Sequence, residues 1–244
     1  MAATLRTDVG KVRKQNEDAA WFDEKQDVYA VADGMGGHLA GEVASAMAIE
    51  AVKRMVKARR SPDIKAMGEM MAAAHEEILR HAQEHPECMG MGTTLCVLWR
   101  ARSYAYIAHV GDSRIYRFRD QALERVTQDH SLVEELVHAG LITREQARTH
   151  PRRNIITRAL GTEGDNTPDL LVTDVKKGDV FLLCTDGLSG MVEDEAIEKT
   201  LREEPLEAAA DSLIAKALEA GGRDNVTLVL YSCGGKGVFP WSRD

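Results

Sequence analysis

The sequence contains no run of about 18 apolar residues, the length that a helix needs to cross a bilayer. Its first residues, MAATLRTDVGKVRKQNED, contain no apolar segment of the kind found in a secretory signal. We therefore expect a cytoplasmic protein without membrane insertion. The sequence also lacks a GxxxxGK[ST] phosphate loop and a DxDxDG calcium loop, which disfavours a P-loop ATPase and a structural calcium protein.

Cysteine and positive charge are also scarce. The four cysteines are scattered and form no CxxC pair, so no disulfide framework is predicted. Cys96 and Cys184 lie inside apolar runs, where buried free thiols are expected. The formal net charge of −8 disfavours nucleic acid as a partner, because binding its phosphates needs a basic surface. A phosphate substrate stays compatible with this charge, since bound divalent cations can reverse the local field.

The pattern of apolar residues predicts a mixed α+β fold. Helical spacing predicts helices over 40–57, 62–85 (with Ser61 as N-cap), 131–139, 143–149, 194–203 and 206–220. Short β-rich runs predict strands over 28–32, 93–99, 104–110, 114–118, 179–185 and 226–231. These elements come in blocks rather than in strict alternation, which favours antiparallel sheets. We expect one domain over 1–233, with a flap at 129–167 and a flexible tail over 234–244.

Four aspartates stand where apolar strands begin or end. Asp33 in AVADGMGG, Asp112 in AHVGDSR and Asp186 in LLCTDGLSG lie beside glycine, and Asp224 in GGRDNVTLVL directly precedes a strand. Taken singly, each Asp-Gly pair is more often a turn than a metal ligand. Charges at the ends of buried strands are costly unless they are paired or bind metal, and Mg²⁺ and Mn²⁺ prefer such carboxylates. The set therefore indicates a divalent-metal site, in which the Gly34 carbonyl could also be a ligand.

A charged segment near the N-terminus reads Arg13-Lys14-Gln15-Asn16-Glu17-Asp18. Alone, such a segment is more often a solvated loop. Its functional interpretation pairs a guanidinium that forks onto phosphate oxygens with acids that reach metals directly or through water.

Six motifs occur in order: RxxNED from Arg13, VADGMGGHxxGExAS from Val31, GTT from Gly92, VGDSRxY from Val110, TDGL from Thr185 and RDNxT from Arg223. Together they resemble the metal-dependent protein phosphatases of type 2C, in the compact bacterial form, over about residues 5–231. The resemblance implies a four-layer α-β-β-α sandwich, in which two central antiparallel sheets are flanked by helix pairs.

The resemblance also implies two Mn²⁺ or Mg²⁺ ions and a weaker third. Asp33 would bridge the first two ions, and the Gly34 carbonyl would bind the second. Asp186 and Asp224 would hold the first ion, while Asp112 would share the third with Asp186.

The implied reaction is hydrolysis of phosphoserine and phosphothreonine by direct attack of a hydroxide that bridges the metals. Glu17 and Asp18 match acids that order metal-bound water, and Arg13 matches the phosphate-binding arginine. Animal-type members carry a histidine directly after the Asp-Gly pair, where this sequence has Met35. The leaving oxygen would then take its proton from another group, either water on the third metal or His38, although a histidine at a helix start can also contact local backbone.

The resemblance implies phosphorylated proteins as partners, including a eukaryotic-type Ser/Thr kinase, and we expect a monomer. Two alternatives are a non-catalytic binding relative of the same fold and a metal-dependent phosphoesterase that acts on small molecules. The four aspartates and Arg13 disfavour the first alternative. The flap residues His130, Thr143 and Arg158 receive no ranking from the sequence.

Overall fold

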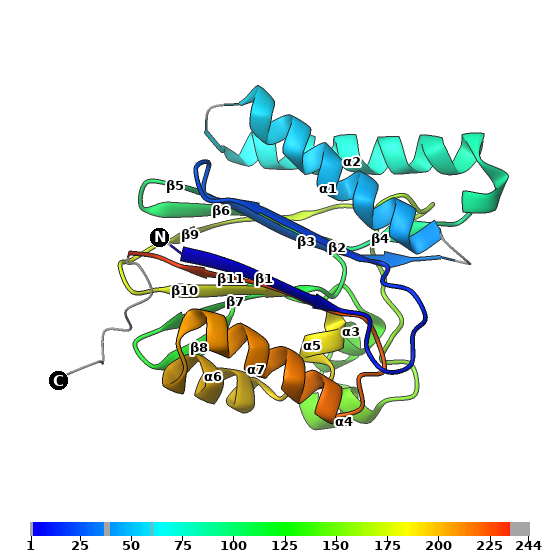
Figure 1. The fold of residues 1–244 in the computed structure, drawn as a ribbon. Helices are drawn as coiled ribbons and strands as arrows, with labels where there is room; N and C mark the ends of the chain where they lie inside the picture. Colours follow the sequence, from blue (N-terminus) through cyan, green and yellow to red (C-terminus); the bar gives the residue numbers. More distant parts are fainter. Residues whose placement is uncertain (1, 37–39, 60, 235–244) are drawn as a thin grey trace.

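The structure is a computed structural model that describes residues 2–36, 40–59 and 61–234. Two antiparallel sheets stack face to face, and helices cover both outer faces (Figure 1). The predicted four-layer sandwich is therefore confirmed. The structure also confirms that Cys96 and Cys184 are buried free thiols.

Each sheet is antiparallel throughout. The first is formed by β1 (Ala2–Asp8), β7 (Arg114–Arg119), β8 (Ala122–Arg125), β10 (Val180–Cys184) and β11 (Val226–Ser232). Its strand order is β1-β11-β10-β7-β8. The second is formed by β2 (Asp18–Asp23), β3 (Val28–Met35), β4 (Gly92–Thr93), β5 (Leu95–Ala101), β6 (Tyr104–Val110) and β9 (Asp169–Asp174). Its order is β2-β3-β5-β6-β9, with β4 paired to β3.

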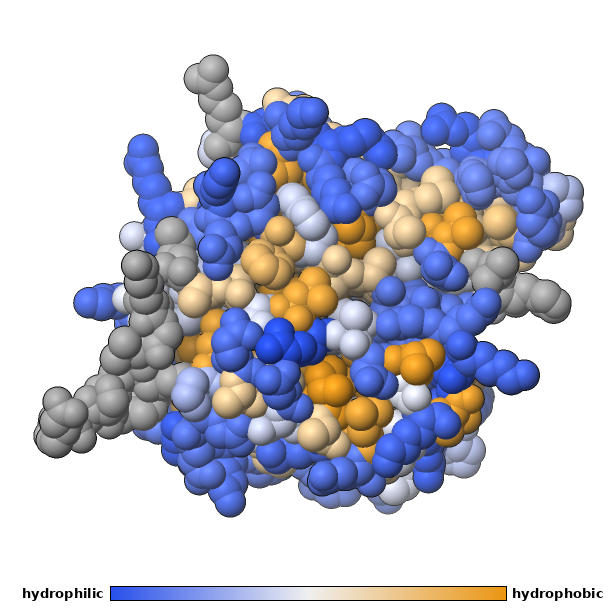
Figure 2. Space-filling model, in the orientation of Figure 1, coloured by the Kyte–Doolittle hydropathy of each residue, from blue (hydrophilic) through white to orange (hydrophobic). Residues whose placement is uncertain are grey.

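Helices α1 (Ala40–Ala58) and α2 (Ile64–Glu84) cover the second sheet, and a short 3-10 turn, Pro86–Cys88, follows them. The first sheet is covered by α5 (Asp186–Ser189), α6 (Asp194–Glu203) and α7 (Leu206–Glu219). The flap carries α3 (Leu132–His138) and α4 (Arg144–Thr149). Hydrophilic residues dominate the outer helices in Figure 2, and apolar patches lie mainly toward the middle of that face. Within the described residues, every helix is too short or too polar to cross a membrane.

Strand β3 shows how an unbroken apolar run produces two cores. Val28, Ala30 and Ala32 pack in the core under α1 and α2, whereas Tyr29 and Val31 pack between the two sheets. Successive side chains of a strand point to opposite faces, so a strand that is buried on both faces must be apolar at every position. The same alternation divides β11 between the inter-sheet core and the core under α7.

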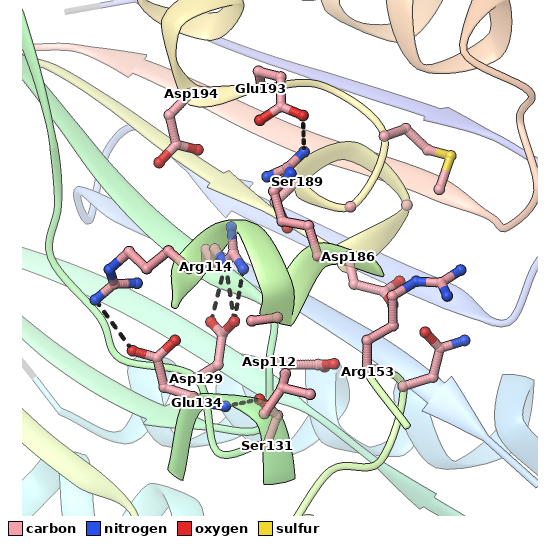
Figure 3. Close-up of a pocket in the computed structure, with 18 of the residues that line it drawn as sticks. Asp112, Arg114, Asp129, Ser131, Glu134, Arg153, Asp186, Ser189, Glu193 and Asp194 are labelled. Atoms are coloured by element: carbon pink, nitrogen blue, oxygen red, sulfur yellow. Dashed lines mark hydrogen bonds and ion pairs between the residues drawn. The ribbon is translucent and has the colours of Figure 1, made fainter. Parts of the chain in front are cut away.

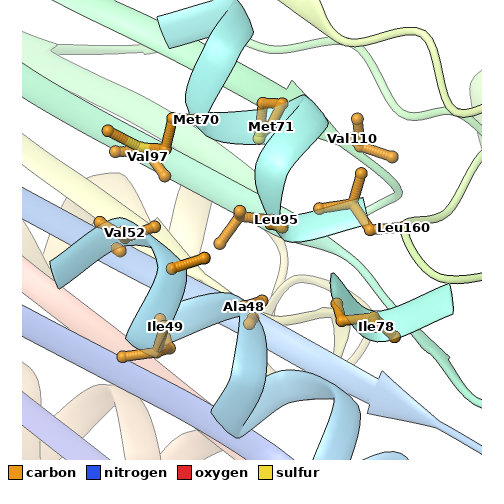
Figure 4. Packing of buried hydrophobic residues seen from close by; sticks show 14 of the residues in the cluster. Ala48, Ile49, Val52, Met70, Met71, Ile78, Leu95, Val97, Val110 and Leu160 are labelled. Carbon is orange, nitrogen blue, oxygen red and sulfur yellow. The ribbon is translucent and has the colours of Figure 1, made fainter. Parts of the chain in front are cut away.

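The core under α1 and α2 is closely packed, as Figure 4 shows. Ile49 and Val52 of α1, Met70 and Met71 of α2, and Leu95 of β5 belong to one buried cluster. Fully burying a side chain of this size stabilises a fold by about 1.5–3 kcal/mol relative to leaving it exposed. This cluster fixes β3 and β5, and with them one half of the site described below.

The strands that the sequence did not predict are the four sheet edges, β1, β8, β2 and β9. Among their residues only Thr4 is buried, so their apolar alternation is weak. An edge strand has a neighbour on one side only and carries more polar residues. Two boundaries also differ from expectation. Asp63 rather than Ser61 caps α2, accepting from Ala66 N at 2.6 Å, and β3 continues to Met35 because β4 pairs with it.

Replacing Leu95, which is fully buried, should destabilise the fold by creating a cavity between α1 and the sheet. We expect Leu95→Ala to lower the free energy of unfolding by about 2–5 kcal/mol. The matched control is Leu141→Ala at a side chain that is 70% exposed, where a change below about 0.5 kcal/mol is expected. Urea titration followed by circular dichroism measures both, and equal effects would contradict this packing.

Candidate metal and phosphate site

Asp33 and Asp18 face each other across neighbouring strands at one end of the sandwich. They are direct partners in the register of β2 and β3. The main chain of Asp33 is held from both sides, because its N–H donates to Thr94 Oγ1 and its carbonyl accepts from Thr93 Oγ1, each at 2.9 Å. The GTT motif therefore fixes the position of Asp33.

Asp186 and Asp224 come from the other sheet. Asp186 begins α5 directly after β10, and Asp224 lies two residues before β11, which pairs with β10. The two segments meet so closely that a Cβ on Gly187 would lie 1.8 Å from the carbonyl oxygen of Asn225. Only glycine fits at this position, which explains the Asp-Gly pair without a hairpin turn.

Asp112 lies in the turn between β6 and β7, and the five aspartates interact strongly. Burial raises the pKa of Asp33 well above its usual value, and the charges of Asp18, Asp186, Asp112 and Asp224 raise it further. Burial likewise raises the pKa of Asp112, followed by the charge of Asp186. The structure therefore brings all four predicted metal aspartates together with Asp18.

Asp18 and Asp186 have raised pKa values in the neutral range. Burial raises the pKa of Asp18 to about 7, although hydrogen bonds from Thr227 and Thr185 lower it. Burial, and then the charge of Asp224, raises the pKa of Asp186 to about 6. Thr185 donates to Asp18 Oδ2 at 2.9 Å, but the buried Oδ1 has no hydrogen-bond partner among the described residues.

Arg13 and Glu17 border this cluster. Arg13 Nη2 donates to Asp224 Oδ2 at 2.9 Å, and Nη1 lies 3.7 Å from Glu17 Oε2. The Arg13 side chain is 48% exposed, so part of its guanidinium can reach a ligand. The Glu17 carbonyl accepts from the N–H of Gly34 at 3.1 Å. The predicted proton donor, His38, lies outside the described residues.

A cavity of about 590 Å³ opens beside Asp112, Asp186 and Asp224, and residues of the flap line part of it (Figure 3). Asp112, Asp186, Asp224 and Arg13 line one end of it, and residues of α3, α4 and α6 line the other. The cavity joins a cluster of acids to a wider polar groove.

Arg114, Asp129 and Asn225 are site residues that were not predicted. Arg114 forks onto Asp129 in the cavity, with its Nε 3.0 Å from Oδ1 and its Nη2 2.7 Å from Oδ2 (Figure 3). Asn225 fixes the N-terminal loop by donating to the carbonyls of Val9 and Gln15 and accepting from Glu17 N. Arg114 and Asn225 stand inside the VGDSRxY and RDNxT motifs, which were the available signal.

The donor set fits hard divalent cations. Carboxylate and carbonyl oxygens are the ligands that Mg²⁺ and Mn²⁺ prefer. Burying several carboxylates together is costly unless cations neutralise them. The neighbouring Arg114 already pairs with Asp129, so its charge is balanced there. The unpartnered Oδ1 of Asp18 is a buried acceptor that a cation or its water would satisfy.

Comparison with known proteins finds similarity over most of the chain. The sequence profile of the protein phosphatase 2C family matches residues 11–221. The serine/threonine phosphatase stp of Listeria monocytogenes is 41% identical over 239 residues, covering 94% of this chain and 95% of that protein. The Mycobacterium tuberculosis serine/threonine phosphatase PstP has a similar crystal structure, with a TM-score of 0.90 at 38% identity over 96% of this chain and 99% of that one.

A second crystal structure holds the catalytic domain of PstP in complex with two manganese ions. It has a TM-score of 0.86 at 37% identity, covering 94% of this chain and 96% of that one. Family profile, relatives and structures therefore agree over nearly the whole chain. The chain belongs to the protein phosphatase 2C family and is a serine/threonine phosphatase.

Proposed function

We propose that the cavity hydrolyses phosphoserine and phosphothreonine in proteins with two divalent ions, Mn²⁺ or Mg²⁺, and a weaker third. The observation that carries this proposal is the convergence of half-buried carboxylates from both sheets, with Asp112, Asp186 and Asp224 lining one cavity and Asp33 beside them. The raised pKa values of Asp18 and Asp186 indicate that the side chains present leave this charge largely unbalanced.

Each acid has a proposed place. Asp33 would lie between the two ions, with the Gly34 carbonyl on the second and with Asp186 and Asp224 on the first. Asp112 would share the third ion with Asp186. When bound, the ions would activate water for attack on phosphorus and offset the charge of the phosphate.

Arg13 is the proposed phosphate ligand. Its guanidinium is held at one edge by Asp224, and its partial exposure leaves N–H groups free to fork onto phosphate oxygens. Held in this way, Arg13 would orient the phosphoryl group over the carboxylates. Glu17 and Asp18 would order water at the same edge, and His38 is our candidate for the proton donor.

The cysteines support a direct displacement without a covalent phosphoenzyme. All four cysteines are buried. Burial raises the pKa of Cys184 to about 12 and that of Cys96 well above its usual value, so neither forms a thiolate near neutral pH. A thiol in this state is a poor nucleophile.

We infer from the family that the substrates are phosphorylated proteins, including a eukaryotic-type Ser/Thr kinase, and that the protein acts as a monomer. The polar groove under the flap supports a protein substrate, because it extends well beyond the space that a single phosphate needs.

Replacing Asp186 should abolish catalysis. We expect Asp186→Ala to lower Mn²⁺-dependent hydrolysis of p-nitrophenyl phosphate by at least about 100-fold, since charge stabilisation by a bound metal is worth several kcal/mol. Asp211→Ala is the matched control, because Asp211 is an exposed carboxylate on α7 that pairs with Arg6 of β1. Absence of activity in the unmodified protein with any divalent metal would contradict the proposal. Faster turnover of nucleotides than of phosphopeptides would favour a small-molecule phosphoesterase.

Metal affinity should fall as the pH is lowered from 8 to 6. The ions bind deprotonated carboxylates, whereas Asp18 and Asp186 hold protons below about pH 7 and pH 6 respectively. The apparent affinity for Mn²⁺ should decrease about tenfold per pH unit for each proton displaced. Calorimetric titrations in two buffers of different ionisation enthalpy count these protons. If Mn²⁺ displaces none at pH 6, the placement of Asp18 and Asp186 beside the ions is wrong.

A kinase encoded beside this phosphatase should lose its phosphates when the two proteins are mixed with Mn²⁺. Asp33→Ala, which removes the proposed bridging ligand, should leave those phosphates in place. Mass spectrometry of the kinase measures each phosphosite. If the phosphates persist equally with the unmodified phosphatase and with Asp33→Ala, the kinase is not a substrate. That result would not contradict hydrolysis of other phosphoproteins.

A further inference from the structure

His109, His130 and Asp169 form a second cluster beside the cavity, and none of the roles above uses them. Their potential ligand atoms all lie within 4.8 Å of one another, and both histidines are buried. The two imidazole rings lie against each other with their centroids 4.7 Å apart. Such a cluster could hold a metal ion, so the protons on the rings must be assigned first.

The hydrogen bonds of His130 oppose a metal ion here. Its Nδ1 accepts from the N–H of Gly111 at 3.1 Å. A neutral imidazole has one N–H and one lone pair, so Nε2 carries the proton and faces Asp169 Oδ2 at 3.2 Å. Burial lowers the pKa of His130, in keeping with this neutral form. Arg158 Nη1 also lies 3.2 Å from Nε2 and 3.3 Å from Asp169 Oδ1, where its positive charge opposes a second cation.

The same hydrogen bonds join His130 to the turn that carries Asp112. Besides the ring contact, the N–H of His130 donates to the carbonyl of Gly111 at 2.8 Å. His130 therefore forms hydrogen bonds with both the N–H and the carbonyl of Gly111. That residue has φ +105°, and a Cβ there would lie 2.4 Å from Thr94 Cγ2, so the turn has no side chain of its own to fix this point.

The other side of the turn is already held. Ser113 Oγ lies 2.7 Å from Thr94 Oγ1, and the carbonyl of Ser113 lies 3.0 Å from His109 Nε2. Asp112 stands between Ser113 and Gly111. The direction of its carboxylate therefore depends on contacts to both neighbours, and His130 supplies those to Gly111.

Asp169 holds the His130 ring from the flap side by accepting from Nε2, and Arg158 in turn pairs with Asp169. His130 is near the start of the flap, Arg158 lies inside it, and Asp169 begins β9 just after it. Thr157 N also donates to the carbonyl of His130 at 2.8 Å. One imidazole thus connects the two ends of the flap to the Gly111 turn.

We propose that His130, oriented by Asp169, is a positioning residue that fixes the Gly111–Asp112 turn and so places the Asp112 carboxylate for the weakest divalent ion of the cavity. A hydrogen bond that orients a ligand is worth about 10- to 100-fold in metal affinity. The inference rests on the proposed metal role of Asp112.

Two substitutions separate the functions of the ring nitrogens. In His130→Asn the amide oxygen replaces Nδ1, which keeps the acceptor for Gly111 and loses Asp169. In His130→Gln the amide nitrogen replaces Nε2, which keeps the donor to Asp169 and loses the acceptor. We expect His130→Gln to weaken the weakest Mn²⁺ site about tenfold or more and His130→Asn to stay within about threefold of the unmodified protein.

The matched control is His75→Gln. Nδ1 of His75 also accepts from a glycine, Gly161, at 3.1 Å, and His75 is not among the residues that line the cavity. Calorimetry with Mn²⁺ gives the number and affinity of the sites, and we expect no change in this control. Equal effects of His130→Asn and His130→Gln, or an equal effect of His75→Gln, would overturn the proposal. If His130→Gln does not fold, Asp169→Asn decides instead. An imidazole needs Asp169 to keep its proton on Nε2 and so leave Nδ1 free to accept from Gly111, whereas the amide oxygen in His130→Asn accepts without that help. Wild-type Mn²⁺ binding in Asp169→Asn therefore overturns the proposal.

Asp112→Asn distinguishes failure of this inference from failure of the proposed function. If Asp112→Asn removes no Mn²⁺ site, the metal role of Asp112 itself is wrong. If it removes the weakest site while His130→Gln leaves that site unchanged, only the positioning role of His130 is wrong.

Discussion

Mutual repulsion among buried carboxylates at one end of the sandwich is the constraint on which the rest of the structure depends. Burial and neighbouring charges raise the pKa of Asp33 strongly, and those of Asp18 and Asp186 to about 7 and 6. A fold tolerates such a cluster only if the surrounding scaffold is rigid and cations can enter. The stacked sheets supply the rigidity, and the cavity beside the aspartates gives access from solvent.

The scaffold holds Asp33 and Asp112 through main-chain contacts, whereas Asp18 and Asp224 also accept hydrogen bonds on their carboxylates. Thr93 and Thr94 form hydrogen bonds with the main chain of Asp33, and His130 forms hydrogen bonds with Gly111 beside Asp112. Gly187 lets the start of α5 touch the segment before β11. This arrangement leaves carboxylate oxygens available for ligands, because hydrogen bonds that fix a position do not occupy the atoms that would bind metal.

The flap and the acids are parts of one hydrogen-bonded structure. Arg114 and Asp129 meet in the cavity, and the neighbouring His130 connects the flap to the turn of Asp112. The flap, which lines part of the cavity, is thus linked to a proposed metal ligand. The physical basis of that link is a single imidazole whose two ring nitrogens face different partners.

The sequence by itself determined the central strands, the longer helices and the candidate acids. Strands buried on both faces are apolar throughout, and six ordered motifs are specific where one Asp-Gly pair is not. The edge strands β1, β2, β8 and β9 escaped prediction because partners across the sheet, rather than their own weak alternation, make them strands. Only the tertiary structure decided that His130 contacts Gly111 and that Asn225 ties down the N-terminal loop, since these contacts join residues whose proximity no local pattern encodes.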